Sequence, residues 1–147
     1  MLITFAEEFS LPVADVYAYF RTPRDWPRLY GSFGEVKDCG GGWFAVPIRG
    51  FPFPLVAKVT SDVPLESVRW SFKGFWAGEG HVSFLPIPGG VSIQGYERIS
   101  PRPLLWLAPL VERLFLEERF RKVWETGWRR LRRQAAGGNS HVRRDSP

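Results

Sequence analysis

The longest periodic pattern in the chain lies in residues 103–136, where apolar side chains recur at spacings of three and four. This spacing places them on one face of a helix, with charged side chains on the opposite face. The pattern therefore predicts a long helix that covers a larger body and keeps its back in water. The apolar face comprises Leu116, Phe120, Val123, Trp124, Gly127 and Leu131. The charged face comprises Glu118, Arg121, Lys122, Glu125, Arg129 and Arg132.

Shorter patterns in the rest of the chain are typical of strands and short helices. Residues 2–9 alternate between apolar and polar side chains, which predicts a first, half-buried strand. Residues 11–20 and 23–30 each have a proline near their start and bulky apolar residues, which predicts two short helices. Clusters of Gly, Pro and Asp then separate six further strands of an antiparallel meander. These six predicted strands are residues 34–38, 43–49, 55–62, 67–73, 77–85 and 90–99.

The predicted strands alternate in a way that separates two faces of the sheet. In one of them, Val68, Trp70 and Phe72 share one parity, and the residues between them are polar or charged. The same alternation recurs in residues 77–85 and 90–99. Because successive side chains of a strand point to opposite faces, we expect one apolar face for the long helix to cover and one face in water.

Length and composition narrow the class of protein. The 147 residues fit one domain, which we place at residues 1–136, with a polar tail at residues 137–147 that we expect to be disordered. No apolar run approaches the roughly 20 residues that cross a bilayer. The first ten residues lack the basic start of a secretory signal. A cytoplasmic protein is therefore expected.

Charge and cysteine content exclude several functions. The net charge is +5, and many of the basic residues follow position 110, where they fall on the predicted back of the long helix, so we expect no nucleic-acid binding. Cys39 is the only cysteine, which excludes an intrachain disulfide and a multi-cysteine metal site. No glycine-rich phosphate loop is present. We expect neither a metal nor a cofactor.

Two stretches resemble a known family. They are residues 3–30, ITFAEEFSLPVADVYAYFRTPRDWPRLY, and residues 51–74, FPFPLVAKVTSDVPLESVRWSFKG. The second stretch contains an acidic-proline turn, followed by a strand that ends in Val-Arg-Trp. Together with the closing helix they resemble the START-like or SRPBCC superfamily, in particular its polyketide cyclase-like branch. The resemblance implies an α+β helix-grip fold, in which a curved seven-stranded antiparallel sheet wraps around a long C-terminal helix and two short helices follow the first strand. It also implies a cavity for a hydrophobic or amphipathic ligand such as a lipid.

The candidate ligand-binding residues combine apolar side chains with the few charged ones that fall near apolar faces. They are Phe20, Leu29, Trp43, Val59, Trp70, Phe72, Trp76, Val82, Phe84, Glu97, Arg113, Glu117, Phe120 and Trp124. The aromatic residues among them can line a cavity, but the same rings can equally fill it as a solid core.

The sequence offers few candidates for catalytic residues. His81 has the parity of the solvent face, which favours a surface residue over a catalytic base. Glu97 shares the parity of Val91 and Ile93 and is the one candidate acid or base. The interpretation we favour for it is structural, either an ion pair at the rim or a bulge at Gly95 that turns the carboxyl outward.

The first part of the long helical stretch is harder to place. Its apolar residues point to a different side from the later stripe, and Pro109 either starts the helix or breaks it. An exposed patch from Leu104 to Phe115 favours a homodimer or contact with a membrane surface.

Taken together, the predicted cavity and the few catalytic candidates predict binding of a small apolar molecule without catalysis. The alternatives are a cyclase, dehydratase or hydrolase of the same superfamily and an interaction module.

Overall fold

The computed structural model describes residues 1–31, 34–48, 53–101 and 110–142, except for the side chains of residues 110–115 and 138–142. These residues form one antiparallel sheet of seven strands in the order β1-β7-β6-β5-β4-β3-β2. The strands are β1 (Leu2–Phe9), β2 (Lys37–Gly40), β3 (Trp43–Val46), β4 (Leu55–Val63), β5 (Ser67–Lys73), β6 (Trp76–Ile87) and β7 (Gly90–Pro101). The helices are α1 (Val13–Tyr17), the 3-10 turn η1 (Pro23–Asp25), α2 (Trp26–Tyr30) and α3 (Leu110–Val142).

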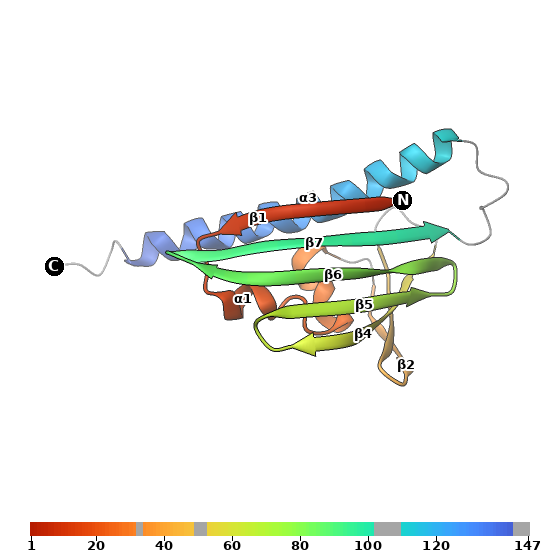
Figure 1. Ribbon diagram of the computed structural model, residues 1–147, viewed down its shortest axis with the longest axis horizontal. Coiled ribbons are helices and arrows are strands. Elements are labelled where there is room, and N and C mark those ends of the chain that lie inside the picture. Colours follow the sequence, from red (N-terminus) through yellow and green to blue (C-terminus); the bar gives the residue numbers. More distant parts are fainter. Residues whose placement is uncertain (32–33, 49–52, 102–109, 143–147) are drawn as a thin grey trace.

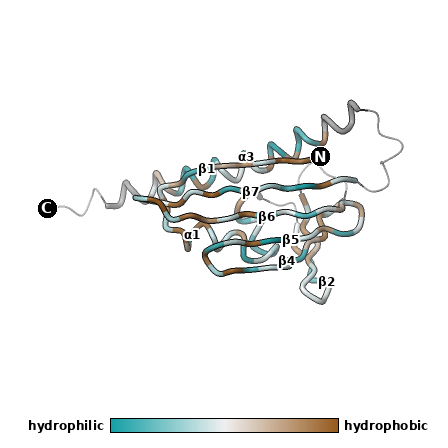
Figure 2. The backbone as a smooth tube through the Cα atoms, in the orientation of Figure 1, coloured by the Kyte–Doolittle hydropathy of each residue, from teal (hydrophilic) through white to brown (hydrophobic). Residues whose placement is uncertain are grey.

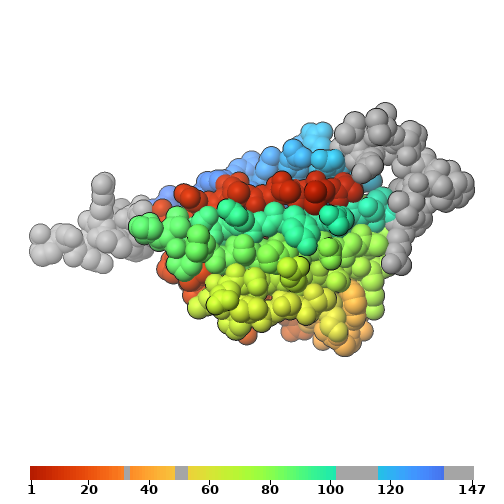
Figure 3. Space-filling model, viewed as in Figure 1, coloured from red at the N-terminus to blue at the C-terminus, as the bar shows by residue number. Residues whose placement is uncertain are grey.

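Six of the seven strands form close to the predicted residues, and they separate a dry face from a wet one. The prediction of a strand at residues 34–38 was wrong, because β2 begins at Lys37 and continues to Gly40. In β5, Val68, Trp70 and Phe72 are buried, while Arg69 and Lys73 are exposed. Figure 2 shows the same alternation of hydrophobic and hydrophilic positions along the neighbouring strands. The helices lie on one side of the sheet, and the strands run side by side over the other side (Figure 1, Figure 3). The core therefore lies between the sheet and the helices, as the helix-grip fold requires.

Helix α3 runs along the sheet beside β1 and also packs on α2 (Figure 1). Its predicted apolar stripe is confirmed, because Phe120, Trp124, Gly127 and Leu131 are buried while the predicted charged face is exposed. Trp128 joins this buried stripe. The helix thus covers the apolar face of the sheet, and its back faces water.

The bounds of α3 differ from the predicted ones at both ends. The helix begins at Leu110 and continues past Ala136 as far as Val142, into the part of the tail that was expected to be disordered. Each added helical residue gains one more backbone hydrogen bond, which carries the helix through Gly137 and Gly138 despite the cost of glycine. Residues 102–109 and 143–147, which include Pro109, lie outside the described residues, as do the side chains of the remaining patch up to Phe115.

Glycine at two positions allows the core to pack as it does. A Cβ atom built on Gly80 in β6 would lie 2.2 Å from Cε2 of Trp70, so the indole ring occupies the space of the missing side chain. A Cβ atom on Gly95 in β7 would lie 2.6 Å from Cζ of Phe5 for the same reason. Large rings therefore lie flat across neighbouring strands, and the inner face of the sheet accommodates them.

Candidate ligand-binding site

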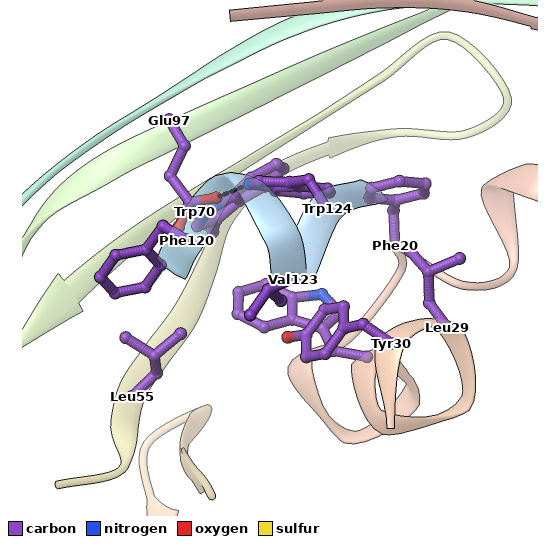
Figure 4. A pocket seen from close by; sticks show the side chains of 10 residues that line it. Phe20, Leu29, Tyr30, Leu55, Trp70, Glu97, Phe120, Val123 and Trp124 are labelled. Carbon is purple, nitrogen blue, oxygen red and sulfur yellow. Dashed lines mark hydrogen bonds between the residues drawn. The ribbon is translucent and has the colours of Figure 1, made fainter. Parts of the chain in front are cut away.

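A pocket lies between the inner face of the sheet and helices α2 and α3. The sheet contributes side chains from β4, β5 and β7, and the helices close the pocket from the other side (Figure 4). Its lining consists of Phe20, Trp26, Leu29, Tyr30, Leu55, Trp70, Glu97, Phe120, Val123 and Trp124. Among the described residues, the site is thus an aromatic pocket with a single carboxyl group.

Most of the pocket is filled by its own aromatic rings. The cavity volume is only about 20 Å³, although the empty space including open solvent at the mouth is about 360 Å³. The ring of Trp124 lies at the centre of this packing, stacked on Phe20 at 6.1 Å and tilted against Trp70 at 6.4 Å between ring centroids. That free space is enough for about one water molecule or a few ligand atoms.

Three neighbouring strands bring Trp70 and Glu97 to the same place. Gly80 in β6 pairs with Trp70 of β5 on one side and with Glu97 of β7 on the other. Because Gly80 has no side chain, Nε1 of Trp70 can lie only 2.4 Å from the position that a Cβ atom of residue 80 would take. The indole N–H of Trp70 therefore lies over the glycine that separates the two residues.

Glu97 is buried on the inner face of β7, and only 4% of the residue is exposed. Its Oε2 atom accepts a hydrogen bond of 2.7 Å from Nε1 of Trp124, drawn as a dashed line in Figure 4. Burial disfavours the charged carboxylate and raises the pKa of Glu97 to about 7, although the hydrogen bond from Trp124 lowers it. The carboxyl group is therefore about half protonated at neutral pH.

Of the two structural interpretations that the sequence favoured for Glu97, the bulge at Gly95 is wrong. The pairing of β7 with both β1 and β6 continues without a shift through Gly95, so no bulge turns the carboxyl outward. Gly95 instead makes room for the ring of Phe5. No ion pair to Glu97 is found among the described side chains. Its buried carboxyl is a feature of the pocket rather than of the rim.

The other polar groups of the pocket are hydrogen-bond donors. Burial, together with the negative charge of Glu97, raises the pKa of Tyr30 well above its usual value, so its hydroxyl keeps its proton. Nε1 of Trp26 and Nε1 of Trp70 are buried and lack a hydrogen-bond partner within the described part of the chain. Buried polar groups are normally hydrogen-bonded, so these two donors call for an acceptor.

The structure brings several of the predicted ligand-binding residues together in this pocket. These are Phe20, Leu29, Trp70, Glu97, Phe120 and Trp124. They come from β5, β7, α2, α3 and the turn after α1, so residues far apart in the sequence meet at one site. Arg113 belongs to α3, but its side chain lies outside the described residues.

Three further predicted residues do not line the pocket, because other side chains cover them. Phe72 packs against Trp26 at 6.1 Å, and Trp76 packs edge-on against Phe120 at 5.2 Å. Phe84 lies between Tyr17 and Phe20, at 5.8 and 5.7 Å between ring centroids.

Four more predicted residues lie elsewhere. Val82 is fully buried in β6, and Val59 is half-buried in β4. Trp43 is half-buried, with Nζ of Lys73 4.3 Å from its ring centroid. Glu117 forms an ion pair of 2.9 Å with Arg121 on the surface of α3.

Four lining residues were not among the predicted ones: Trp26, Tyr30, Leu55 and Val123. Val123 had a usable signal, since it belongs to the apolar stripe of the long helix. Trp26 and Tyr30 lie in a helix of only five residues, too short for a periodic pattern that would show which side faces the core.

Other candidate chemistry lies away from this pocket. His81 lies on the outer face of the sheet, paired with the exposed Arg69 and beside Tyr96, as its parity predicted, and partial burial and Arg69 lower its pKa. Cys39 is exposed on β2. Within residues 1–31, 34–48, 53–101 and 110–142 no cluster of His, Cys, Asp and Glu could hold a metal ion. None of the helices in this part of the chain is long and apolar enough to cross a membrane.

Fold and pocket together define a helix-grip protein with an aromatic site between sheet and helix, and solved structures support that fold. DR_A0006 from Deinococcus radiodurans is 19% identical, with a TM-score of 0.63 over 93% of this chain and 98% of that chain. The Aha1 dimer from Colwellia psychrerythraea is 12% identical, with a TM-score of 0.64 over 90% and 96%. XoxI from Bacillus cereus is 10% identical, with a TM-score of 0.68 over 92% and 95%.

At these identities the similarity establishes the fold alone. No protein-family model matches the sequence, and no curated protein sequence matches it either. The function therefore has to be argued from the pocket.

Proposed function

We propose that this chain binds a small, largely apolar molecule in the pocket between the sheet and α3, and that it does so without catalysis. The observation that carries the proposal is the buried carboxyl of Glu97, which lies among aromatic rings without a cationic partner among the described side chains. Burying such a group costs free energy that an apolar core residue would not cost. A ligand that forms a hydrogen bond with this carboxyl group would account for its burial.

Apolar burial would supply most of the affinity. A ligand that removes about 200 Å² of apolar surface from water gains about 5 kcal/mol before ordering costs. Because the rings leave little free space, the ligand must enter at the mouth and displace side chains there. Val123 and Tyr30 are only half-buried, and they are the side chains best placed to move.

A second candidate function is proton-transfer catalysis by Glu97. It is favoured by the pKa of about 7, which suits a general acid or base at neutral pH. A cyclase or dehydratase of the polyketide cyclase-like branch would use such a group. If the chain is an enzyme, Glu97→Gln will keep ligand affinity and abolish turnover; if it is a binding protein, ligand will be released unchanged by both forms.

A homodimer through residues 104–115 is a further part of the proposal. The bacterial Aha1 structure of the same fold is described as a dimer. Native mass spectrometry reports the oligomeric state directly, and a monomer at all protein concentrations would exclude this assembly.

Cytoplasmic residence, expected from the sequence, also stays a prediction.

The binding function is tested by blocking the pocket. Val123→Phe adds a ring at the half-buried mouth, whereas Val63→Phe adds the same ring to a side chain that is 42% exposed at the end of β4. Native mass spectrometry of the purified chain should show a copurified molecule in the parent and in Val63→Phe, and none in Val123→Phe. A ligand-free parent that also binds no added small aromatic probe would contradict the proposal.

A further inference from the structure

The polar groups of the pocket lie close together at its sheet side. The indole N–H of Trp70 lies over Gly80, and the carboxyl group of Glu97 comes from the residue that pairs with Gly80 on the next strand. One oxygen of this carboxyl already accepts the hydrogen bond from Trp124. The N–H of Trp70 has no partner among the described residues. One donor without an acceptor and one carboxyl thus flank the same glycine.

We propose that the ligand of this pocket is an uncharged apolar molecule with one hydrogen-bond-accepting oxygen, such as a ketone, ester or amide, held between Trp70 and Glu97. The indole N–H donates to this oxygen, and so does the carboxylic acid O–H of Glu97. The inference rests on the proposed binding function and specifies the chemical class of the ligand.

An anionic ligand does not fit this lining. Among the described side chains, the lining includes no Lys, Arg or His that would offset a negative charge, and Glu97 itself becomes negative as the pH rises. Desolvating an unpaired anion beside a carboxylate costs several kcal/mol.

A cationic ligand meets a mixed environment. Aromatic faces and an ionised Glu97 attract an ammonium group. However, the indole groups of Trp26 and Trp70 can only donate hydrogen bonds, so they offer an ammonium group no acceptor. The orphaned donors therefore favour an acceptor oxygen over an amine.

The protonation state of Glu97 distinguishes the two remaining classes of ligand, neutral oxygen compounds and amines. A neutral oxygen ligand needs the protonated acid as a donor, whereas an amine needs the carboxylate. Tyr30 on α2 is the only other titratable residue among the described side chains of the lining, and its raised pKa keeps it neutral. The neighbours of Glu97 across the sheet, Ile3 and Gly80, and its neighbours on α3, Phe120 and Trp124, are uncharged.

The test is isothermal titration calorimetry of the full chain with four probes that share a phenyl ring: toluene, acetophenone, benzylamine and benzoate. Acetophenone is expected to bind about five- to hundredfold more tightly than toluene, the gain of two buried hydrogen bonds. With a pKa of about 7 for Glu97, binding that requires the acid should be about tenfold weaker at about pH 8 than at about pH 6.

Three variants separate the contributions of the polar groups. Trp70→Phe keeps a ring but removes the N–H, so it should weaken acetophenone binding by about two- to tenfold, the loss of one of the two hydrogen bonds, while toluene binding is unchanged. Glu97→Gln should keep acetophenone binding and lose its pH dependence, because the amide still donates and does not titrate. Glu79→Gln, the same exchange at an exposed position of β6, is the matched control and should change neither.

Each outcome decides a different question. Tightest binding of benzylamine, with affinity that rises with pH, would overturn the inference but leave the binding function standing. Equal affinities for acetophenone and toluene would also overturn it, since the polar groups would then hold only a water molecule. If none of the four probes binds, the proposed binding function itself fails.

Discussion

The indole N–H of Trp124 donates a hydrogen bond of 2.7 Å to Oε2 of Glu97, and this bond joins helix α3 to strand β7 inside the core. Both residues are buried and both line the pocket. The contact therefore couples the ionisation of one carboxyl to the packing of the long helix on the sheet. Stability and ligand binding should both depend on it.

The first prediction concerns the pH dependence of stability. The pKa of Glu97 is about 7 in the folded chain and about 4.5 in an unfolded one, so the folded state binds the proton more tightly. Glu97 then lowers the free energy of unfolding as the pH rises from about 4 to about 8, by about 3 kcal/mol in total. Glu97→Gln removes this loss, and urea denaturation of both forms across this range measures it.

Because other groups also titrate over this range, the informative quantity is the difference between the parent chain and Glu97→Gln at each pH. The exposed exchange Glu79→Gln provides the control. A difference that stays constant with pH would contradict a buried, strained carboxyl at position 97.

The second prediction concerns the hydrogen bond itself. Trp124→Phe keeps a ring at the centre of the pocket but removes the donor that favours the charged form of Glu97. The pKa of Glu97 should rise further, and the chain should lose about 1 to 3 kcal/mol of stability. Carbon NMR of the labelled carboxyl group measures the pKa, and an unchanged value would show that the bond does not form in solution.

The third prediction compares two glycines. Gly80→Ala places a methyl group 2.2 Å from Cε2 of Trp70 and must push the indole away, which should cost about 2 kcal/mol or more. Gly137→Ala meets nothing within 4 Å on the exposed surface of α3 and should stabilise the chain by about 0.5 to 1 kcal/mol. Chemical denaturation distinguishes the two, and equal effects would contradict the close approach of Trp70 to β6.

The fourth prediction concerns the contact between the later part of α3 and β1, where Arg132 donates a hydrogen bond to the carboxylate of Glu7. The two side chains are 52% and 27% exposed, so water and salt screen the pair. Arg132→Ala should therefore cost less than about 1 kcal/mol, and the loss should shrink further at high salt. A loss of several kcal/mol in the denaturation midpoint analysis would show that this pair anchors the helix.

The fold was predictable because its elements follow simple periods. Strand β5 occupies the predicted residues, and the face that carries Val68 and Trp70 was visible in the alternation alone. The long helix was equally clear, since its buried residues recur at helical spacing. Its end was not predictable, because the gain in backbone hydrogen bonds outweighs the unfavourable composition of the tail only by a small margin.

The site was only partly predictable, because periodicity gives the face of a side chain but not what covers it. Trp70 and Phe72 share a strand and a parity, and Trp26 packs against both rings at 5.6 and 6.1 Å, yet of the two only Trp70 lines the pocket. The position of Trp26 depends on a five-residue helix that has no period of its own. The role of Gly80 was not predictable either. It depends on the register of β5, β6 and β7, which the residues next to Gly80 in the sequence do not determine.

The most direct test of the central claim uses the indole N–H signals of the chain in a two-dimensional nitrogen-15 NMR spectrum, recorded while acetophenone is added. The signals of Trp26, Trp70 and Trp124 are predicted to shift together with one dissociation constant, because all three line the pocket. The signal of Trp43, which lies outside it, should stay in place. Shifts confined to Trp43, or none at all at saturating probe, would contradict a ligand-binding pocket between the sheet and α3.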